Sequence, residues 1–266
     1  MKTLKAIKIL MGLFCLLLTQ RSFAQQSVSA ADSLDRYFLK LSETERFKKE
    51  NLKEISMRLA SLEGPAFQFV LENQAEIEQV LGKNTVKNKI SGLILKEKIQ
   101  PQIWKDTARK IPVNAVPAWE TMRKQLQKKY GRSNADMAVL SAKFEFFDKQ
   151  KDSKNLALAF MENIDRNGLD TSGLNKVFFN NLMFQVMLPN LESPALLLKC
   201  ANWMRLVIDS NPVMSPDQID TYANLLYKAK HVKDAMIWEK KAMDLAPDVA
   251  AFRETYEKMA KGIRTW

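Results

Sequence analysis

The chain has 266 residues, a formal net charge of +11 and one histidine, and 46% of its residues are hydrophobic. His231 has no second imidazole or thiolate with which it could hold zinc. The sequence has neither the glycine loop that cradles phosphates nor the G-x-S-x-G setting of a hydrolase serine. We therefore expect a protein that is not an enzyme and that has no cofactor and no catalytic or metal site.

The first residues have the pattern of a secretory signal. Lys2, Lys5 and Lys8 precede an apolar run over residues 9–18, and Ser22-Phe23-Ala24 fits the small-residue cleavage site. This pattern predicts a signal peptide over residues 1–24 and export to the periplasm or the medium. The apolar run is too short to cross a bilayer comfortably, so we expect no transmembrane segment in the mature chain.

The two cysteines allow one alternative and exclude another. Cys15 could indicate a lipoprotein, but it lies inside the apolar run behind bulky Phe14. Cleavage after Ala24 leaves Cys200 as the sole cysteine, so an intramolecular disulfide is impossible. Cys200 belongs to the apolar run LLLKCANWM, which favours a small buried side chain over a reactive thiol.

Apolar residues of the mature chain recur at spacings of three and four, and strand signals are nearly absent. The sequence therefore predicts an all-α fold with an N-terminal helical region over 25–152 and a C-terminal one over 153–266. Residues 25–31 are expected to be a loose leader. The expected helices cover residues 34–41, 42–62, 67–81, 85–100, 119–130, about 137–147, 156–164, 174–188, 194–210, 219–229, 232–246 and 249–263.

Capping residues mark several helix starts. Ser42 and Glu45 form the pattern of a capping box, and Thr85 and Ser153 are expected as further N-caps. The run FEFF at 144–147 could pass for a strand. The helical period on both sides of it favours a helix.

Residues 219–247 form the pattern on which the fold class depends. Two helices meet at Lys230-His231, small residues fall where the helices must approach each other, and a proline ends the second helix. This stretch resembles a tetratricopeptide (TPR) repeat, with Ala223, Ala235, Ala242 and Pro247 on that motif's small and terminating positions. Lys230 replaces the usual turn glycine and Glu239 a usual aromatic.

The repeat period extends upstream only in degenerate form. Ala201 precedes Ala235 by one period, but Pro189 falls where the preceding helix would need a small residue. The expected architecture is a stack of helical hairpins, an α-solenoid that is TPR-like at its C-terminus, closed by the polar helix over 249–263.

Two further stretches carry a family resemblance. Two stretches, residues 61–90 (SLEGPAFQFVLENQAEIEQVLGKNTVKNKI) and residues 174–243 (including LNKVFFNNLMF, DTYANLLYK and AMIWEKKAM), resemble the helical region that follows the thioredoxin fold in exported bacterial thioredoxin-family proteins. Only a signal peptide is expected before the helices here, so no active-site residue is carried over. The resemblance implies an auxiliary subunit of a thiol-redox system.

The basic residues are concentrated in one stretch. Residues 83–132 hold thirteen Lys or Arg against Glu97, Asp106 and Glu120. Within this stretch we expect a solvated basic face, opposite the apolar stripe of its helix, made by Arg123, Lys124, Lys128 and Lys129. Such a face could meet an anionic surface, such as lipid headgroups, a polysaccharide or an acidic protein, or could serve solubility alone.

The remaining motif is a possible calcium loop at Asp165, Asn167 and Asp170. Counted from Asp165, an EF-hand would need glycine at the sixth position and glutamate at the twelfth, where this chain has Asp170 and Lys176. A capped turn explains these residues better.

The sequence thus predicts a non-enzymatic exported helical-repeat protein that binds a protein or peptide partner and no nucleic acid. The alternatives are the auxiliary subunit of a periplasmic thiol-redox system and a binder of an envelope polyanion.

Overall fold

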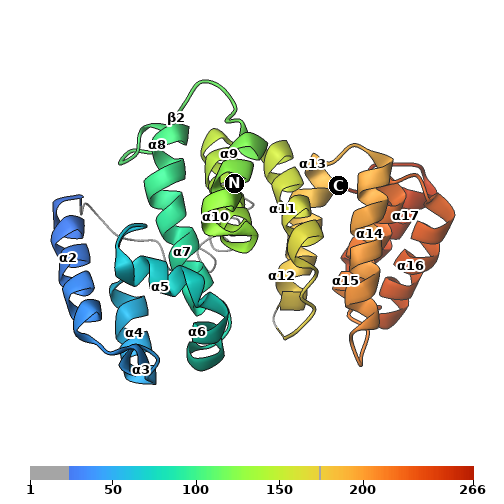
Figure 1. The fold of residues 1–266 in the computed structure, drawn as a ribbon. Coiled ribbons are helices and arrows are strands. Elements are labelled where there is room, and N and C mark those ends of the chain that lie inside the picture. Colours follow the sequence, from blue (N-terminus) through green and yellow to red (C-terminus); the bar gives the residue numbers. More distant parts are fainter. Residues whose placement is uncertain (1–23, 174) are drawn as a thin grey trace. The chain divides into compact units, whose positions relative to one another are not determined.

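The computed structural model describes residues 24–173 and 175–266 (Figure 1). The all-α class is confirmed, because helices form nearly all regular structure of these residues and only two short strands, β1 and β2, pair. The described residues form two compact units, which divide between Lys151 and Asp152. The predicted signal peptide lies outside the described residues except for Ala24.

The first unit comprises residues 24–151. Its elements are α2 (Ala24–Lys40), α3 (Glu43–Arg46), α4 (Lys49–Arg58), α5 (Pro65–Glu72), α6 (Gln74–Leu81), α7 (Thr85–Ile94), the π-helix η1 (Leu95–Ile99), α8 (Gln100–Ile103), β1 (Trp104–Asp106), β2 (Ile111–Pro112), α9 (Trp119–Tyr130) and α10 (Arg132–Gln150).

The first helices of this unit differ from the expectation. Helix α2 begins at Ala24, so the residues expected as a loose leader are helical. The capping box is confirmed, since Glu45 N–H donates to the Ser42 side chain and Ser42 N–H to the Glu45 carboxylate. The helix that it starts ends after one turn, where Phe47 packs edge-on against the Phe69 ring at 5.1 Å. A separate helix, α4, follows.

The core of the first unit is formed by α7, α9 and α10, with α7 and α10 side by side in Figure 1. Ile90 and Ile94 of α7 are fully buried, as is Phe146 of α10. Two tryptophan rings pack against the Phe146 ring: that of Trp119 at 5.5 Å and that of Trp104, in the β-hairpin, at 5.7 Å between ring centres. The FEFF segment is therefore helical, as the period predicted, and its aromatic rings fill this core.

The second unit comprises the described residues from 152 to 266. Its elements are α11 (Ser153–Asn167), α12 (Asn175–Leu182), the π-helix η2 (Met183–Met187), α13 (Leu188–Asn190), α14 (Pro194–Asp209), α15 (Pro216–Lys228), α16 (Val232–Leu245) and α17 (Ala250–Ala260). The cap of α11 is Asp152 and not Ser153, because the Asp152 carboxylate accepts the Asn155 N–H at 3.0 Å.

A wide helical turn precedes a proline in each unit. The π-helix η1 is followed by Pro101, and η2 is followed by Pro189 at the same spacing. A proline inside a helix lacks its N–H and collides with the carbonyl one turn before it. The wider turn accommodates both defects, so the helix continues to Ile103 in one unit and to Asn190 in the other. This explains why Pro101 does not stop its helix.

Helices α15 and α16 form a closely packed hairpin. Ala223, Ala235 and Ala242 are fully buried in it, so the small residues allow the two helix backbones to approach. Helix α15 ends in a Schellman turn, in which His231 N–H donates to Leu226 O and Lys230 N–H to Tyr227 O. Lys230 takes the left-handed position of this turn, with φ = 72°.

None of the described helices combines the length and apolar character needed to cross a membrane.

Candidate functional site

The predicted basic face on α9 is wrong in one of its four residues. Arg123 is buried, with 2% of its surface exposed, whereas Lys124, Lys128 and Lys129 are exposed as predicted. The reason is that Arg123 follows Met122 on the edge of the apolar stripe, and the start of α10 covers this edge with an acidic residue, Asp136. A charge at a stripe edge can be buried when its partner comes from another helix, which periodicity alone does not show.

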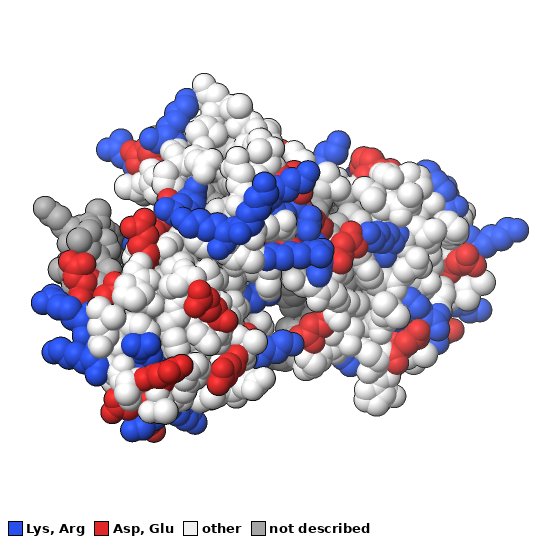
Figure 2. All heavy atoms as spheres, in the orientation of Figure 1, with Lys and Arg blue, Asp and Glu red and all other residues white. Residues whose placement is uncertain are grey.

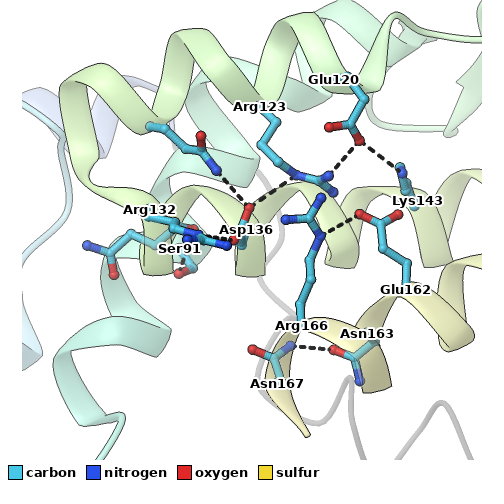
Figure 3. Close-up of polar contacts among 12 residues, drawn as sticks. Ser91, Glu120, Arg123, Arg132, Asp136, Lys143, Glu162, Asn163, Arg166 and Asn167 are labelled. Atoms are coloured by element: carbon cyan, nitrogen blue, oxygen red, sulfur yellow. Dashed lines mark hydrogen bonds and ion pairs between the residues drawn. The ribbon is translucent and has the colours of Figure 1, made fainter.

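Arg123 joins α9 to α10 electrostatically. Its Nη1 donates to Glu120 Oε1 at 2.5 Å, and its Nε lies 3.2 Å from Asp136 Oδ1 (Figure 3). Lys143 of α10 reaches the same Glu120 oxygen at 3.8 Å, and Gln127 donates to Asp136 at 3.0 Å. Both carboxylates are thus engaged by groups of their own unit, which fits a role of Arg123 in the packing of α9 on α10.

The three exposed lysines of α9 differ from Arg123 in having no such pairing. Among the described residues no carboxylate lies within ion-pair distance of Lys124, Lys128 or Lys129, and Lys129 contacts the Tyr130 ring at 5.4 Å. Figure 2 shows Lys and Arg gathered in a band over the part of the first unit that α7 to α10 form. Uncompensated positive charge of this kind attracts anions over about a Debye length, ~8 Å at physiological ionic strength.

Cys200 lies inside the second unit, on α14. Its side chain is fully buried, and this burial raises the pKa of the thiol to about 12. A thiol in this environment is almost wholly protonated at neutral pH and is therefore a poor nucleophile. In a thiol-redox system the reacting sulfur atoms would have to come from a partner.

The residues of the possible calcium loop are engaged in a turn and an ion pair. Asp170 accepts hydrogen bonds from the Ser172 N–H and the Asn175 side chain, and Asp165 pairs with Lys199 of α14 at 2.6 Å. Glu162–Arg166 and Asn163–Asn167 are further contacts within α11 (Figure 3). Within 24–173 and 175–266, no group of three His, Cys, Asp or Glu side chains is placed to hold a metal ion.

The sequence reasoning missed two acidic groups in the α15–α16 hairpin. Glu239 of α16 is fully buried, with 0% exposure, and neither of its carboxyl oxygens receives a hydrogen bond from an N–H or hydroxyl group of the described residues. The neighbouring group that acts on it is the carboxyl of Asp220 on α15, which itself accepts the Asn224 Nδ2–H at 2.9 Å. The signal was present in the sequence, since Glu239 occupies a position that is aromatic in the motif.

Both carboxyl groups of this pair favour the protonated form. Desolvation first, and then the charge of Asp220, raise the pKa of Glu239 to about 9. Desolvation also raises the pKa of Asp220, to about 6, against the effect of its hydrogen bonds to Glu239 and Asn224. These values belong to the pair, because the charge on one carboxyl group depends on the other.

Helix α16 distributes its side chains in an unusual way. The face toward α15 carries Ala235, Glu239 and Ala242, all fully buried. On the other face Ile237 is 67% and Leu245 is 48% exposed, with Lys241 one turn from each. Ile237 and Leu245 of this helix therefore face solvent, whereas an amphipathic helix usually buries its large aliphatic residues and exposes its charged ones.

These residues do not converge on one pocket. The arrangement offers an exposed apolar stripe on α16, defined by Ile237 and Leu245. It also offers a group of unpaired lysines on α9, and a carboxyl pair in which Glu239 is buried and Asp220 half-buried. Comparison of the chain with protein-family models, curated proteins and solved structures finds no match.

Proposed function

We propose that the protein is a non-enzymatic exported protein that binds a protein or peptide partner through the C-terminal hairpin. The observation that carries this proposal is the exposed apolar stripe of α16. Ile237 and Leu245 occupy positions i and i+8 of one helix, so they project from the same face two turns apart. Anchors at such spacings are typical of helices that dock against an apolar groove.

The energetics favour an interface at this stripe. Transfer of one large aliphatic side chain from water to an apolar environment contributes ~1.5–3 kcal/mol. Single exposed apolar residues are common on protein surfaces. Here, however, Ala235 and Ala242 occupy the buried positions of the same helix, so much of the apolar surface of Ile237 and Leu245 remains in water. A partner that covers the stripe would gain this free energy.

The test is a capture experiment with matched variants. Tagged mature protein is incubated with an envelope extract of its own cells, and the captured proteins are identified by mass spectrometry. A double variant, Ile237→Ser with Leu245→Ser, should lose a specific partner that the wild type captures. The control is Glu254→Ser with Lys258→Ser, two exposed residues of α17 that lie outside the stripe, and it should retain the partner.

A cross-linking experiment locates the contact. A photoreactive amino acid at position 237 should link to the captured partner, whereas one at position 254, on α17, should not. If the serine variant captures the same partner as the wild type, the stripe of α16 is not the interface and the proposal is wrong.

The unpaired lysines of α9 favour a second candidate function, the binding of an anionic surface. Lys124, Lys128 and Lys129 are exposed, and no described carboxylate pairs with them. Substitution of all three by Gln should weaken the retention of the protein on an anionic resin, and the retention of the wild type should fall steeply with salt. Arg123 is left unchanged because it is buried. Equal retention of wild type and variant would refute this candidate.

A further inference from the structure

The carboxyl pair in the C-terminal hairpin lies away from the stripe at which a partner is proposed to bind, and its surroundings point to a role of its own. We propose that Asp220 and Glu239 hold one proton between them at neutral pH, and that loss of this proton as the pH rises loosens the α15–α16 hairpin.

The geometry requires a proton at this position. Glu239 is fully buried, and within the described residues its carboxyl oxygens meet another carboxyl group rather than a donor. Two neighbouring carboxylates repel each other, and an unpaired buried charge has a large desolvation cost. A proton on one oxygen removes one charge and provides the missing donor, since a protonated carboxyl can donate to an ionised one.

Among residues 24–173 and 175–266, no cation acts on the pair in place of this proton. The groups that act on the pair are the two carboxyls themselves and Asp217 of α15, which is also acidic. Arg253 and Lys258 of α17, which packs against α16, are exposed. Three cations of the other surrounding segments have partners elsewhere. Arg205 of α14 pairs with Asp209 and lies over the Trp238 ring, Lys228 of α15 donates to Leu188 O and Glu192, and Lys241 of α16 lies 4.9 Å from the centre of Trp238.

The pair is connected to the end of the chain by hydrogen bonds. The Asn224 side chain donates from Nδ2 to Asp220, and its Oδ1 accepts the hydroxyl hydrogen of Thr265. Beside Thr265, Trp266 packs on the Tyr227 ring at 6.1 Å. When the shared proton leaves to solvent, the two carboxylates repel each other across the interface of α15 and α16. We expect this repulsion to separate the helices at the pair and to weaken the docking of residues 265–266.

The direction of the pH effect follows from proton linkage. In the unfolded chain Glu239 has its ordinary pKa of 4.5, so at pH 6–8 it has lost its proton, whereas the folded pair retains one. The folded state therefore binds more protons than the unfolded state in this range, and stability falls as the pH rises. One proton corresponds to about a tenfold increase in the unfolding constant for each pH unit.

Urea unfolding of the mature protein at pH 6, 7 and 8 tests this inference. The proposal expects the unfolding constant of the wild type to rise about 100-fold from pH 6 to pH 8 relative to Glu239→Gln, which keeps the shape and is always neutral. The control Glu254→Gln removes an exposed glutamate on the neighbouring α17 and should follow the wild type. Parallel curves for wild type and Glu239→Gln would overturn the proposal. So would failure of Glu239→Gln to fold at pH 6, because the site would then need an ionised carboxylate.

Two further measurements address the proton and the hairpin separately. The infrared C=O band of a protonated carboxyl group should be present in the wild type at pH 7 and missing in Glu239→Gln. At pH 9.5 the wild type should be cleaved within residues 216–245 by a protease faster than Glu239→Gln, both being measured at the same pH. Loss of the pH dependence without any difference in cleavage would show that the proton is shared but that the hairpin does not loosen.

Discussion

Arg123 provides the sharpest test of the packing of the first unit. The substitution Arg123→Gln removes a guanidinium that is 98% buried and that lies between Glu120 and Asp136. Glutamine keeps one amide but has neither the charge nor the reach of arginine. The Asp136 side chain, 11% exposed, then retains Gln127 at 3.0 Å and a distant contact, 3.7 Å, to the exposed Arg132.

The expected loss of stability follows from the buried charge that remains. Removal of one member of a buried ion pair costs about 3–5 kcal/mol, mostly because the other member loses its compensation. Glu120 contributes little to this cost, since its side chain is 60% exposed and water can solvate it. We therefore expect a loss near ~3 kcal/mol, which is a large part of the ~5–15 kcal/mol by which a typical domain is stable.

Urea unfolding followed by circular dichroism measures this loss. Lys124→Gln is the matched control, because it removes a positive charge one residue away that is exposed, and it should change stability by less than ~0.5 kcal/mol. The double variant Arg123→Gln, Asp136→Asn should recover part of the loss, because it removes the carboxylate that the guanidinium had balanced. If Arg123→Gln unfolds at the same urea concentration as Lys124→Gln, the guanidinium is not buried against Asp136.

Three further predictions concern the second unit. Lys230→Gly should stabilise the protein by up to ~1 kcal/mol in urea unfolding. The substitution removes the ~1–2 kcal/mol cost of a left-handed backbone at a residue with a side chain, and the greater entropy of glycine in the unfolded chain offsets ~0.4–1 kcal/mol of that gain. A loss of stability would show that residue 230 does not have this conformation. Ala235→Leu should overpack the α15–α16 interface and lower stability by ~1–3 kcal/mol, and a variant that melts like wild type would show that Ala235 does not lie there. In the mature protein Cys200, whose pKa burial raises to about 12, should react with a disulfide reagent at pH 8 only after unfolding, and rapid labelling of the native protein would contradict its burial.

Local sequence signals predicted the helices well and their ends less well. The capping box at Ser42 and Glu45 is present, and Trp119 to Tyr130 form one helix that ends at Gly131 as expected. These signals failed where a contact with a residue distant in the sequence determines the end of a helix. The helix ends at Phe47, whose ring packs on Phe69. Pro101 is accommodated by a π-helical turn, which the spacing of apolar residues does not reveal. Such features depend on tertiary packing, which a local pattern does not contain.

The charged residues show the same limit more strongly. Lys124, Lys128 and Lys129 are exposed as predicted, because their exposure depends only on their positions on the polar side of α9, which the helical period gives. Arg123 and Glu239 were not predicted to be buried, since each depends on an acidic residue from another helix, Asp136 in one unit and Asp220 in the other. The departure of Glu239 from the aromatic position of the motif was visible, but its meaning required the position of Asp220.

The two proposals for the C-terminal hairpin make a joint prediction, because Glu239 and the exposed stripe lie on opposite faces of α16. A partner that binds Ile237 and Leu245 needs α16 in place, so loosening of the hairpin should lower its affinity as the pH rises. Glu239→Gln should then keep its affinity between pH 7 and pH 9, whereas the serine variant of the stripe should bind weakly at every pH. Capture measured across this range separates the causes. A decline in the wild type that is missing in Glu239→Gln would place the pH dependence in the hairpin, and an equal decline in both would place it in the partner.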